Sequence, residues 1–410
     1  MRARAIGVLG LLLASLLPAA AQAPSAPAPS GAEPPVASDV RVGGDAKQTR
    51  FVIDLSRKVD LRTFTLADPY RVVIDLPQVT FQLPADAGEH GRGLVKAFRY
   101  GLMMPGGSRI VLDTSGPVRI DKAFVLDAAD SQPARLVVEL VAVSRDAFLR
   151  AAAVDRRLPE RAAAPPEQRP AGETRPTIVL DPGHGGIDSG TRSAASGTDL
   201  AEKALVLDFA LMLRDKLQKT GKYNVIMTRS DDSFVPLGDR VRFARQHNAE
   251  LFISIHCDAL AHGEGEAEGA SIYTLSDHAS DPDSARLADV ENRADVISGV
   301  DLSAEPDDIA GILIDLAQRE TKTFSLQFAK DLVKDLGGAV RLHKHALKSA
   351  GFRVLKAPDV PSVLIELGYV SNRSDLKDLT SEAWRSRAGD SIAQAVDAYF
   401  TTRLAGGPAR

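Results

Sequence analysis

TIVLDPGHGGIDSG, residues 177–190, decides the fold of the second half of the chain. Aliphatic and β-branched residues run without interruption into Asp-Pro-Gly, a single histidine and two further glycines. A run of this kind, closed by turn residues, is typical of a buried strand that ends in a tight loop. Sites in open α/β sheets gather where strands end, so His184 is the first candidate for a functional residue.

The residues that follow alternate between strand and helix patterns. An apolar helical stripe runs from Leu200 to Leu217, and a second helix is predicted over 236–248. Further strands are predicted in YNVIMTR, ELFISIHCDA, GASIYTLS and PSVLIELG. This alternation predicts an α/β domain over residues 176–405, with a mostly parallel sheet and helices on both faces.

The first half of the chain is predicted to be all-β. TRFVIDLS at Thr49 is similar to SRIVLDTS at Ser108, and YRVVIDLP at Tyr70 is similar to ARLVVELV at Ala134. We interpret this as a duplicated strand-turn-strand unit, whose two half-sheets would face each other in a small sandwich over 41–145. Because no cluster of histidines, cysteines or carboxylates has the spacing of a site, we expect binding or a structural role there.

The N-terminus predicts export. Two arginines precede a short apolar run that ends in Ala-Gln-Ala, so residues 1–23 are predicted to be a signal peptide for the general secretory route. A membrane anchor is the alternative, although the run is short for a span. Residues 24–40 are predicted to be a disordered tether. We expect a periplasmic protein that is not an integral membrane protein after signal cleavage.

Length, charge and cysteine content limit the remaining possibilities. A chain of 410 residues is too long for one typical core, and the proline-rich stretch 146–175 separates the two domains as a linker in which Asp146–Arg157 could form a short helix. The net charge of −4 gives no case for a nucleic-acid partner. Cys257 is the only cysteine, so the chain folds without an intramolecular disulfide.

Four side chains are predicted to meet at one edge of the α/β sheet. His184 and His256 follow two strands, Glu366 ends a third, and Glu202 lies near the start of the first helix. Two imidazoles and one carboxylate are the ligand set of a hydrolytic zinc site, and the other carboxylate would move a proton. Glu202 suits the ligand and Glu366 suits the proton shuttle, although spacing alone leaves this assignment open.

The motifs VLDPGHGGIDSG, EKALVLDFA, SIHCDA, GASIYTLS and PSVLIELGYVSN resemble those of the zinc-dependent N-acetylmuramoyl-L-alanine amidases of the type 3 family. The resemblance implies one zinc ion held by His184, Glu202 and His256, with Glu366 as the catalytic glutamate. It implies cleavage of the amide between N-acetylmuramic acid and the first L-alanine of the peptidoglycan stem peptide. The β-rich segment resembles the AMIN domain that precedes this catalytic domain in periplasmic division amidases, so we expect it to hold the protein near the wall.

Three residues that lie close to the candidate ligands in the sequence are candidates for secondary roles at the site. Cys257 stands where the family usually has a smaller residue, and thiolate is a zinc ligand. Because neighbours on a strand point to opposite faces, we expect Cys257 to be a buried apolar residue that faces away from the metal. Asp188 and Asp258 are candidates for orienting the ligand imidazoles, with a simple turn role as the alternative.

Residues 278–320 form a long insertion with helical signals. ENRADVISGV resembles the regulatory helix of the division amidases, in which a glutamate occupies the open position of the zinc; Glu291 is the matching residue. We therefore expect autoinhibition by Glu291. An apolar stripe over 307–321 predicts an amphipathic helix, either a docking face for a protein activator or a face packed on its own domain.

The sequence thus predicts a periplasmic zinc amidase that remodels peptidoglycan during daughter-cell separation. A zinc peptidase or deacylase acting on another amide of the wall is the alternative enzyme, because the metal ligands alone do not choose the substrate. A non-enzymatic wall-binding protein is a second alternative, which the complete set of four side chains opposes.

Overall fold

The computed structural model describes residues 33–155 and 175–405, apart from 85, 104–105, 130–131, 194–199, 260–266 and 301–311. The predicted signal peptide, most of the tether and most of the linker lie outside these residues. In the described part of the chain, no helix combines the length and apolar character needed to cross a membrane. Contacts join the described residues from Pro35 onward into one compact unit.

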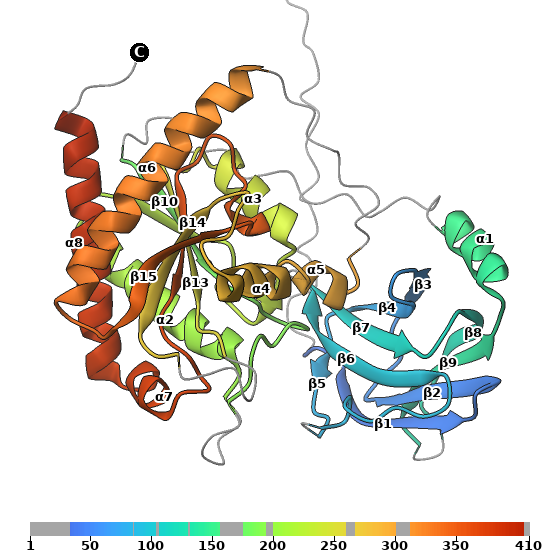
Figure 1. Ribbon diagram of the computed structural model, residues 1–410. Coiled ribbons are helices and arrows are strands. Elements are labelled where there is room, and N and C mark those ends of the chain that lie inside the picture. The colour runs from blue at the N-terminus through green and yellow to red at the C-terminus, as the bar shows by residue number, and fades with distance from the viewer. Residues whose placement is uncertain are drawn as a thin grey trace, which may run out of the picture. The chain divides into compact units, whose positions relative to one another are not determined.

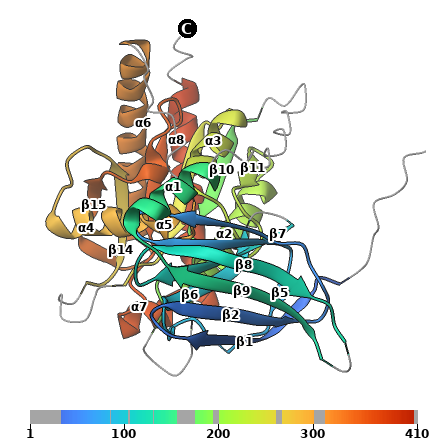
Figure 2. The same ribbon diagram turned by 90° about the vertical axis from the view of Figure 1, so that its right-hand side faces the viewer.

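The first half of the chain forms all but one strand of two five-stranded sheets (Figure 2). One sheet has the strand order β5 (Thr80–Phe81), β1 (Val36–Gly44), β2 (Gln48–Leu55), β9 (Ala134–Ala142), β8 (Val118–Leu126). The other has the order β12 (Ser233–Phe234), β6 (Val95–Met103), β7 (Gly107–Thr114), β4 (Arg71–Pro77), β3 (Arg62–Leu66). Strand β12 comes from the second half of the chain and pairs in parallel with β6.

The duplicated unit is divided between the two sheets. Strand β2 of the first copy pairs with β9 of the second, and β4 of the first pairs with β7 of the second. The predicted sandwich is therefore confirmed, but each sheet combines one strand from each copy instead of forming from one copy. Phe51 and Ile53 of one sheet and Ile74 and Ile110 of the other share one buried core, so each copy contributes to both sides of it.

The sandwich begins earlier in the chain than the sequence predicts. Strand β1 starts at Val36, whereas the tether was predicted to extend to residue 40. Ala37 is fully buried and pairs with Leu55, which explains why these residues belong to the sheet. At the other end, α1 (Arg145–Asp155) confirms the short helix considered for the start of the linker.

The second half of the chain contains a six-stranded sheet (Figure 1). Its order is β11 (Asn224–Met227), β10 (Thr177–Pro182), β13 (Leu251–His256), β16 (Ser362–Glu366), β14 (Ala270–Leu275), β15 (Leu342–Ala350). All neighbouring strands are parallel except β14 and β16. The predicted mostly parallel sheet is confirmed.

Helices cover both faces of this sheet because its central strands are apolar on both sides. Ile178 and Leu180 of β10 pack in one core, whereas Val179 between them packs in another. The first core includes α2 (Glu202–Lys219), α6 (Ile312–Gly337), α7 (Arg373–Leu379) and α8 (Glu382–Ala405), and α6 and α8 lie side by side in Figure 1. The second includes α3 (Leu237–Gln246), α4 (Pro282–Glu291) and the short helix η2 (Arg353–Leu355).

The insertion contains α4, the short helix α5 (Ala294–Ile297) and the first part of α6. Residues 307–311 of the predicted amphipathic helix lie outside the described residues. From Ile312 onward that helix is continuous with the one predicted around Phe324, so the structure has one long helix where the sequence suggested two.

Candidate active site

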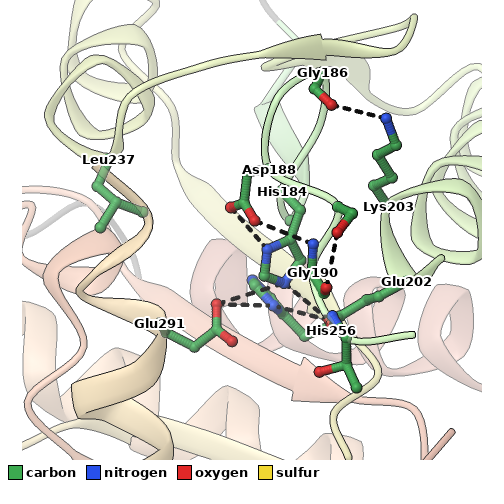
Figure 3. Close-up of polar contacts among 12 residues, drawn as sticks. His184, Gly186, Asp188, Gly190, Glu202, Lys203, Leu237, His256 and Glu291 are labelled. Atoms are coloured by element: carbon green, nitrogen blue, oxygen red, sulfur yellow. Dashed lines mark hydrogen bonds and ion pairs between the residues drawn. The ribbon is translucent and has the colours of Figure 1, made fainter. Parts of the chain in front are cut away.

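The two histidines meet at the carboxyl edge of the sheet. His256 is the last residue of β13, and His184 follows the neighbouring parallel strand β10. Their ring centroids are 4.9 Å apart, and both side chains are buried. His184 Nε2 and His256 Nδ1 have no hydrogen-bond partner among the described residues, although both nitrogens are buried. Two lone pairs are thus available at one point (Figure 3).

Two carboxylates approach the same point. Glu202 Oε1 lies 3.1 Å from His184 Nε2 and 3.3 Å from His256 Nδ1. Glu291 Oε2 lies 3.6 and 3.4 Å from the same two nitrogens, on the other side of the rings in Figure 3. The ligand atoms of His184, His256 and Glu291 all lie within 4.8 Å of one another. Glu202 is at least as close to both imidazoles as Glu291 is, and it therefore belongs to the same group of candidate ligands.

These distances fit a tetrahedral zinc site. Bonds of about 2.0–2.1 Å from zinc to nitrogen and oxygen give edges of roughly 3.3 Å between ligands. The four ligand–ligand distances above, from 3.1 to 3.6 Å, match such edges. The charges around the site also suit a metal ion. Burial opposes protonation of His184, but the negative charges of Glu202, Asp188 and Glu291 outweigh it. The His184 pKa is therefore raised well above its ordinary value. The site therefore favours a cation.

The two carboxylates differ in how firmly they are held. Glu202 is the first residue of α2, and its oxygens accept hydrogen bonds from the backbone N–H groups of Cys257 (2.9 Å) and Thr191 (3.0 Å). Glu291 is the last residue of α4, inside the insertion. A carboxylate at the C-terminal end of a helix is unfavourable next to the helix dipole, so a cation in the site would compensate it.

Buried arginines hold the loop that carries His184. Arg240 of α3 donates to the carbonyls of Pro182 (2.8 Å) and His184 (2.7 Å) and pairs with the buried Asp181 (2.8 Å). Arg229, after β11, donates to the carbonyls of Pro182 (3.0 Å) and Gly183 (2.7 Å). The loop needs this support because His184 has φ of +59°, which an L-residue seldom adopts. Neither arginine was predicted as a functional residue, because no local pattern in the sequence marks it.

The loop also needs its glycines. A Cβ on Gly183 would lie 2.3 Å from the His256 ring. Gly190 has φ of +62°, and a Cβ there would lie 2.7 Å from both the Glu202 carboxylate and the His184 ring. The glycines therefore let the backbone pass directly beside the ligand side chains.

The Asp188 side chain contacts the candidate ligand His184. The Asp258 side chain forms no hydrogen bond or ion pair with a candidate ligand among the described residues. His184 Nδ1 lies 2.9 Å from Asp188 Oδ2, so Nδ1–H donates to the carboxylate and Nε2 is left for the metal. The Asp258 side chain accepts from the Ala259 N–H (2.6 Å) instead. Burial and the charges of Glu202 and Glu291 raise the Asp258 pKa to about 7.

Glu366 lies beside His256, because the two residues are register partners on β16 and β13. It is fully buried, and its Oε2 accepts from the Asp258 N–H at 3.0 Å. Its Oε1 has no hydrogen-bond partner among the described residues. Burial, reinforced by Asp258, Glu202 and Glu291, raises the Glu366 pKa well above its ordinary value. Cys257, between His256 and Asp258, is fully buried, as expected, in the apolar core that includes α2, α6, α7 and α8.

The comparisons with known proteins agree with this geometry. Residues 178–398 match the family model described as N-acetylmuramoyl-L-alanine amidase, and residues 39–141 match the AMIN domain. The chain is 32% identical to N-acetylmuramoyl-L-alanine amidase AmiC of Escherichia coli, over 88% of each chain. It is 33% identical to AmiC of Neisseria meningitidis, over 87% of this chain and 88% of that protein.

A solved structure, N-acetylmuramoyl-L-alanine amidase AmiC2 of Nostoc punctiforme, aligns with 56% of this chain and 99% of its own at 22% identity, with a TM-score of 0.40. Among the alternatives left by the metal ligands, the family match selects the amidase over a peptidase, a deacylase or a non-enzymatic wall protein. The chain belongs to the N-acetylmuramoyl-L-alanine amidase family, with an AMIN domain before the catalytic domain, and is an N-acetylmuramoyl-L-alanine amidase whose substrate is peptidoglycan.

Proposed function

We propose that the chain uses one zinc ion, held by His184, Glu202 and His256, to hydrolyse the amide between N-acetylmuramic acid and the first L-alanine of the stem peptide. The observation that carries this proposal is the pair of buried imidazole nitrogens that face Glu202 Oε1 at 3.1 and 3.3 Å. When bound, zinc would lower the pKa of a water molecule to about 7 and polarise the amide carbonyl.

Glu366 is proposed to move the proton. Its Oε1 would accept a proton from the attacking water and deliver it to the nitrogen of L-alanine as the amide bond breaks. The hydrogen bond from the Asp258 N–H to Oε2 supports this role, because it fixes the carboxylate and leaves Oε1 available. Asp188 would keep His184 in the tautomer that presents Nε2 to the metal.

Product analysis tests this chemistry. Mass spectrometry of digested peptidoglycan should find intact stem peptides that begin with L-alanine, together with glycan strands that lack them. Removing zinc with a chelator should abolish their release, and adding zinc should restore it. Glu366→Gln should lower kcat by roughly 10²–10⁴-fold while the protein still binds zinc. Full activity in that folded variant would refute the proposed mechanism.

Glu291 is proposed to inhibit the resting enzyme by taking the fourth zinc position, where the attacking water must bind. Its Oε2 is 3.4–3.6 Å from the two imidazole nitrogens, and the residue is buried. Burial is the largest influence on the Glu291 pKa and raises it despite the nearby imidazoles, so a bound cation would favour the ionised carboxylate.

Zinc affinity tests this contact without relying on activity. Glu291→Ala should weaken zinc binding in a competition with a fluorescent chelator, by roughly tenfold for one lost ligand. Asp289→Ala, which removes the same charge from an exposed position of the same helix, is the matched control and should have no effect. Equal zinc affinity in both variants would count against Glu291 as a ligand.

An activator protein is proposed to release Glu291 by binding residues 307–321, for which the sequence predicts an amphipathic helix. Its support is the apolar stripe of that segment in the sequence and the continuity of the segment with α6 from Ile312 onward. Leu313→Glu together with Leu316→Glu should leave the basal activity of the purified protein unchanged. In cells that lack their own amidases, the same variant should fail to restore daughter-cell separation, measured as cell-chain length; normal separation would exclude this surface.

The protein is also proposed to act in the periplasm, exported by residues 1–23 and held near the wall by its AMIN domain. The basic and apolar N-terminus supports export. Fractionation of cells that express a C-terminally tagged chain should recover it in the periplasmic fraction, shortened by the signal peptide. Recovery of the full-length chain in the membrane fraction would support an anchor instead.

A further inference from the structure

One face of α4 covers the catalytic edge of the sheet at more than the metal site. Asp281, Ser284, Leu287 and Glu291 follow one another at spacings of three, three and four residues, so they share a helix face. Ser284, Leu287 and Glu291 are buried. Asp281 is the N-cap of the helix and accepts from the Ser284 N–H at 2.8 Å. Glu291 contacts the candidate metal ligands. The other residues of this face show which further parts of the catalytic edge α4 covers.

The far end of this face lies on a buried lysine. Lys348 of β15 has a side chain that is only 5% exposed, and its Nζ lies 4.0 Å from Asp281 Oδ2. The same Nζ lies 5.8 Å from the centre of the Tyr273 ring. The Ser284 hydroxyl donates to the same Asp281 Oδ2 at 2.7 Å, which holds this carboxylate beside the lysine. A buried ammonium is costly unless a carboxylate compensates it, and here that carboxylate belongs to the inserted helix.

A small cavity lies between this lysine and Asp258, the neighbour of the candidate ligand His256. It has a volume of about 20 Å³ and is lined on one side by Arg286 and Leu287 of α4. Lys348, Tyr369 and Asp258 line the other side, and the Asp258 N–H is the donor to Glu366. Lys348 and the residue that donates to Glu366 therefore line the same space beside α4. If α4 moves away, this space opens and Lys348 loses Asp281.

The spacing along α4 indicates what would replace Asp281. Ten residues separate Asp281 from Glu291, which is roughly 15 Å along a helix. An extended peptide covers that length in about four residues. A stem peptide with its first amide at the metal would thus bring a carboxylate about four residues further along the peptide near Lys348.

We propose that Lys348, beside Tyr273, binds a carboxylate of the stem peptide about four residues from the cleaved amide, and that Asp281 occupies this subsite in the resting enzyme. The inference rests on the proposed function of the metal site. On this account α4 blocks the enzyme twice, with Glu291 at the metal and Asp281 at the lysine. The role of Lys348 is specificity, and it takes no part in the bond-breaking step.

Peptide binding tests the subsite separately from catalysis. We would measure, by calorimetry, the affinity of the zinc-free full-length Glu291→Ala protein for stem tetrapeptides that begin with L-alanine. Lys348→Gln in this background should weaken binding of the free-acid peptide by roughly tenfold or more, the effect of losing one charge-assisted hydrogen bond. Lys348→Arg should restore most of the affinity. Lys330→Gln, the same charge change at an exposed position of α6, should have no effect.

Amidated peptides identify which carboxylate binds. One peptide carries an amide at the side-chain carboxylate of the third residue, and another carries it at the C-terminus. One of these amidations should weaken binding to the Glu291→Ala protein and have no further effect once Lys348→Gln is added. That amidation identifies the carboxylate that Lys348 recognises. Equal affinities of the parent protein for the free-acid peptide and both amides would overturn the proposal, even if Lys348→Gln does not fold.

Kinetics on the zinc-loaded enzyme separate the two proposals. Lys348→Gln should raise KM for soluble N-acetylmuramoyl tetrapeptides by roughly tenfold and change kcat by less than about twofold. A fall in kcat with unchanged KM would overturn the specificity role. If the parent protein binds the peptides in this charge-dependent way but does not cleave the N-acetylmuramoyl–L-alanine bond, the proposed chemistry fails and the subsite stands.

Discussion

The position of His184 depends on residues that are distant in the sequence and cannot be recognised from it. The sequence places the histidine after a strand and surrounds it with glycines, and the structure adds Arg229 and Arg240, which satisfy the carbonyls of the loop. Asp181 then pairs with Arg240 under the loop. No local pattern marks these arginines, because each becomes buried only when neighbouring elements come together. The ligand types are thus predictable at the scale of single residues, whereas their supports are not.

Arg240→Met should therefore destabilise the protein strongly. The Arg240 and Asp181 side chains are 2% and 0% exposed, so removing one partner leaves a buried charge. We expect a loss of about 3–5 kcal/mol in the free energy of unfolding, together with weaker zinc binding. Arg242→Met, in an exposed pair two residues away, should change stability by less than about 1 kcal/mol. Chemical denaturation measures both, and equal small effects would contradict the role given to Arg240.

The stability of the metal-free protein should fall as pH rises from about 4 to 7. The Asp258 pKa is raised to about 7 from an ordinary 3.8, so the folded state keeps a proton that the unfolded chain has released. The raised pKa of Glu366 acts in the same direction. Thermal melts of the chelated protein between pH 4.5 and 7.5 should show a falling Tm, with a shallower fall in Asp258→Asn. A Tm that rises over this interval would contradict this account.

At the scale of elements, the parallel strands explain why the site could be predicted. β10, β13 and β16 are parallel neighbours, so their carboxyl ends bring His184, His256 and Glu366 to one edge. Strand β15 was not predicted, because LHKHALKSA has charged and histidine side chains where a buried strand is usually apolar. Lys348, one of these, is nevertheless buried, with Asp281 at the start of α4 lying 4.0 Å from its Nζ. The division of the duplicated unit between two sheets was not predicted either, because it depends on pairing between strands that are far apart in the sequence.

Gly183→Ala should disable the metal site while leaving the sheet intact. The new Cβ would meet the His256 ring at 2.3 Å, so either the loop or the imidazole must move. We expect zinc affinity to fall by roughly 10–100-fold, as when the orientation of a ligand is lost. Gly338→Ala, whose Cβ would have an ordinary contact of 3.6 Å, is the control. Unchanged zinc affinity in Gly183→Ala, measured by chelator competition, would contradict the need for this glycine.

At the scale of the whole molecule, the AMIN domain contacts the segment that follows Glu291. Arg71 and Arg99 donate to the carbonyls of Val296 and Ile297, and Arg109 donates to that of Gly299 at 2.9 Å. These contacts hold the end of α5 and the residues just after it, five to eight residues after Glu291. If Glu291 inhibits the enzyme as proposed, these contacts of the AMIN domain would help to hold the insertion in the inhibiting position.

Replacing Arg71, Arg99 and Arg109 together by alanine should raise basal activity. With fewer contacts on the end of α5, Glu291 should leave the metal more often. We expect about a 3–10-fold faster release of stem peptides if the three hydrogen bonds contribute together on the order of 1 kcal/mol. A triple substitution of the exposed Arg57, Arg92 and Lys96 in the same domain is the control. An unchanged rate in the arginine variant would show that the AMIN domain does not restrain the insertion.

The most direct test of the whole account compares the basal rates of the zinc-loaded full-length protein and its Glu291→Ala variant. The measurement is the initial rate of stem-peptide release from purified peptidoglycan, with Asp289→Ala as the control. If Glu291 occupies the position of the attacking water, Glu291→Ala should be at least about tenfold faster than the parent protein, whereas Asp289→Ala should match the parent. Equal rates for a folded, zinc-loaded Glu291→Ala variant and the parent would contradict the account.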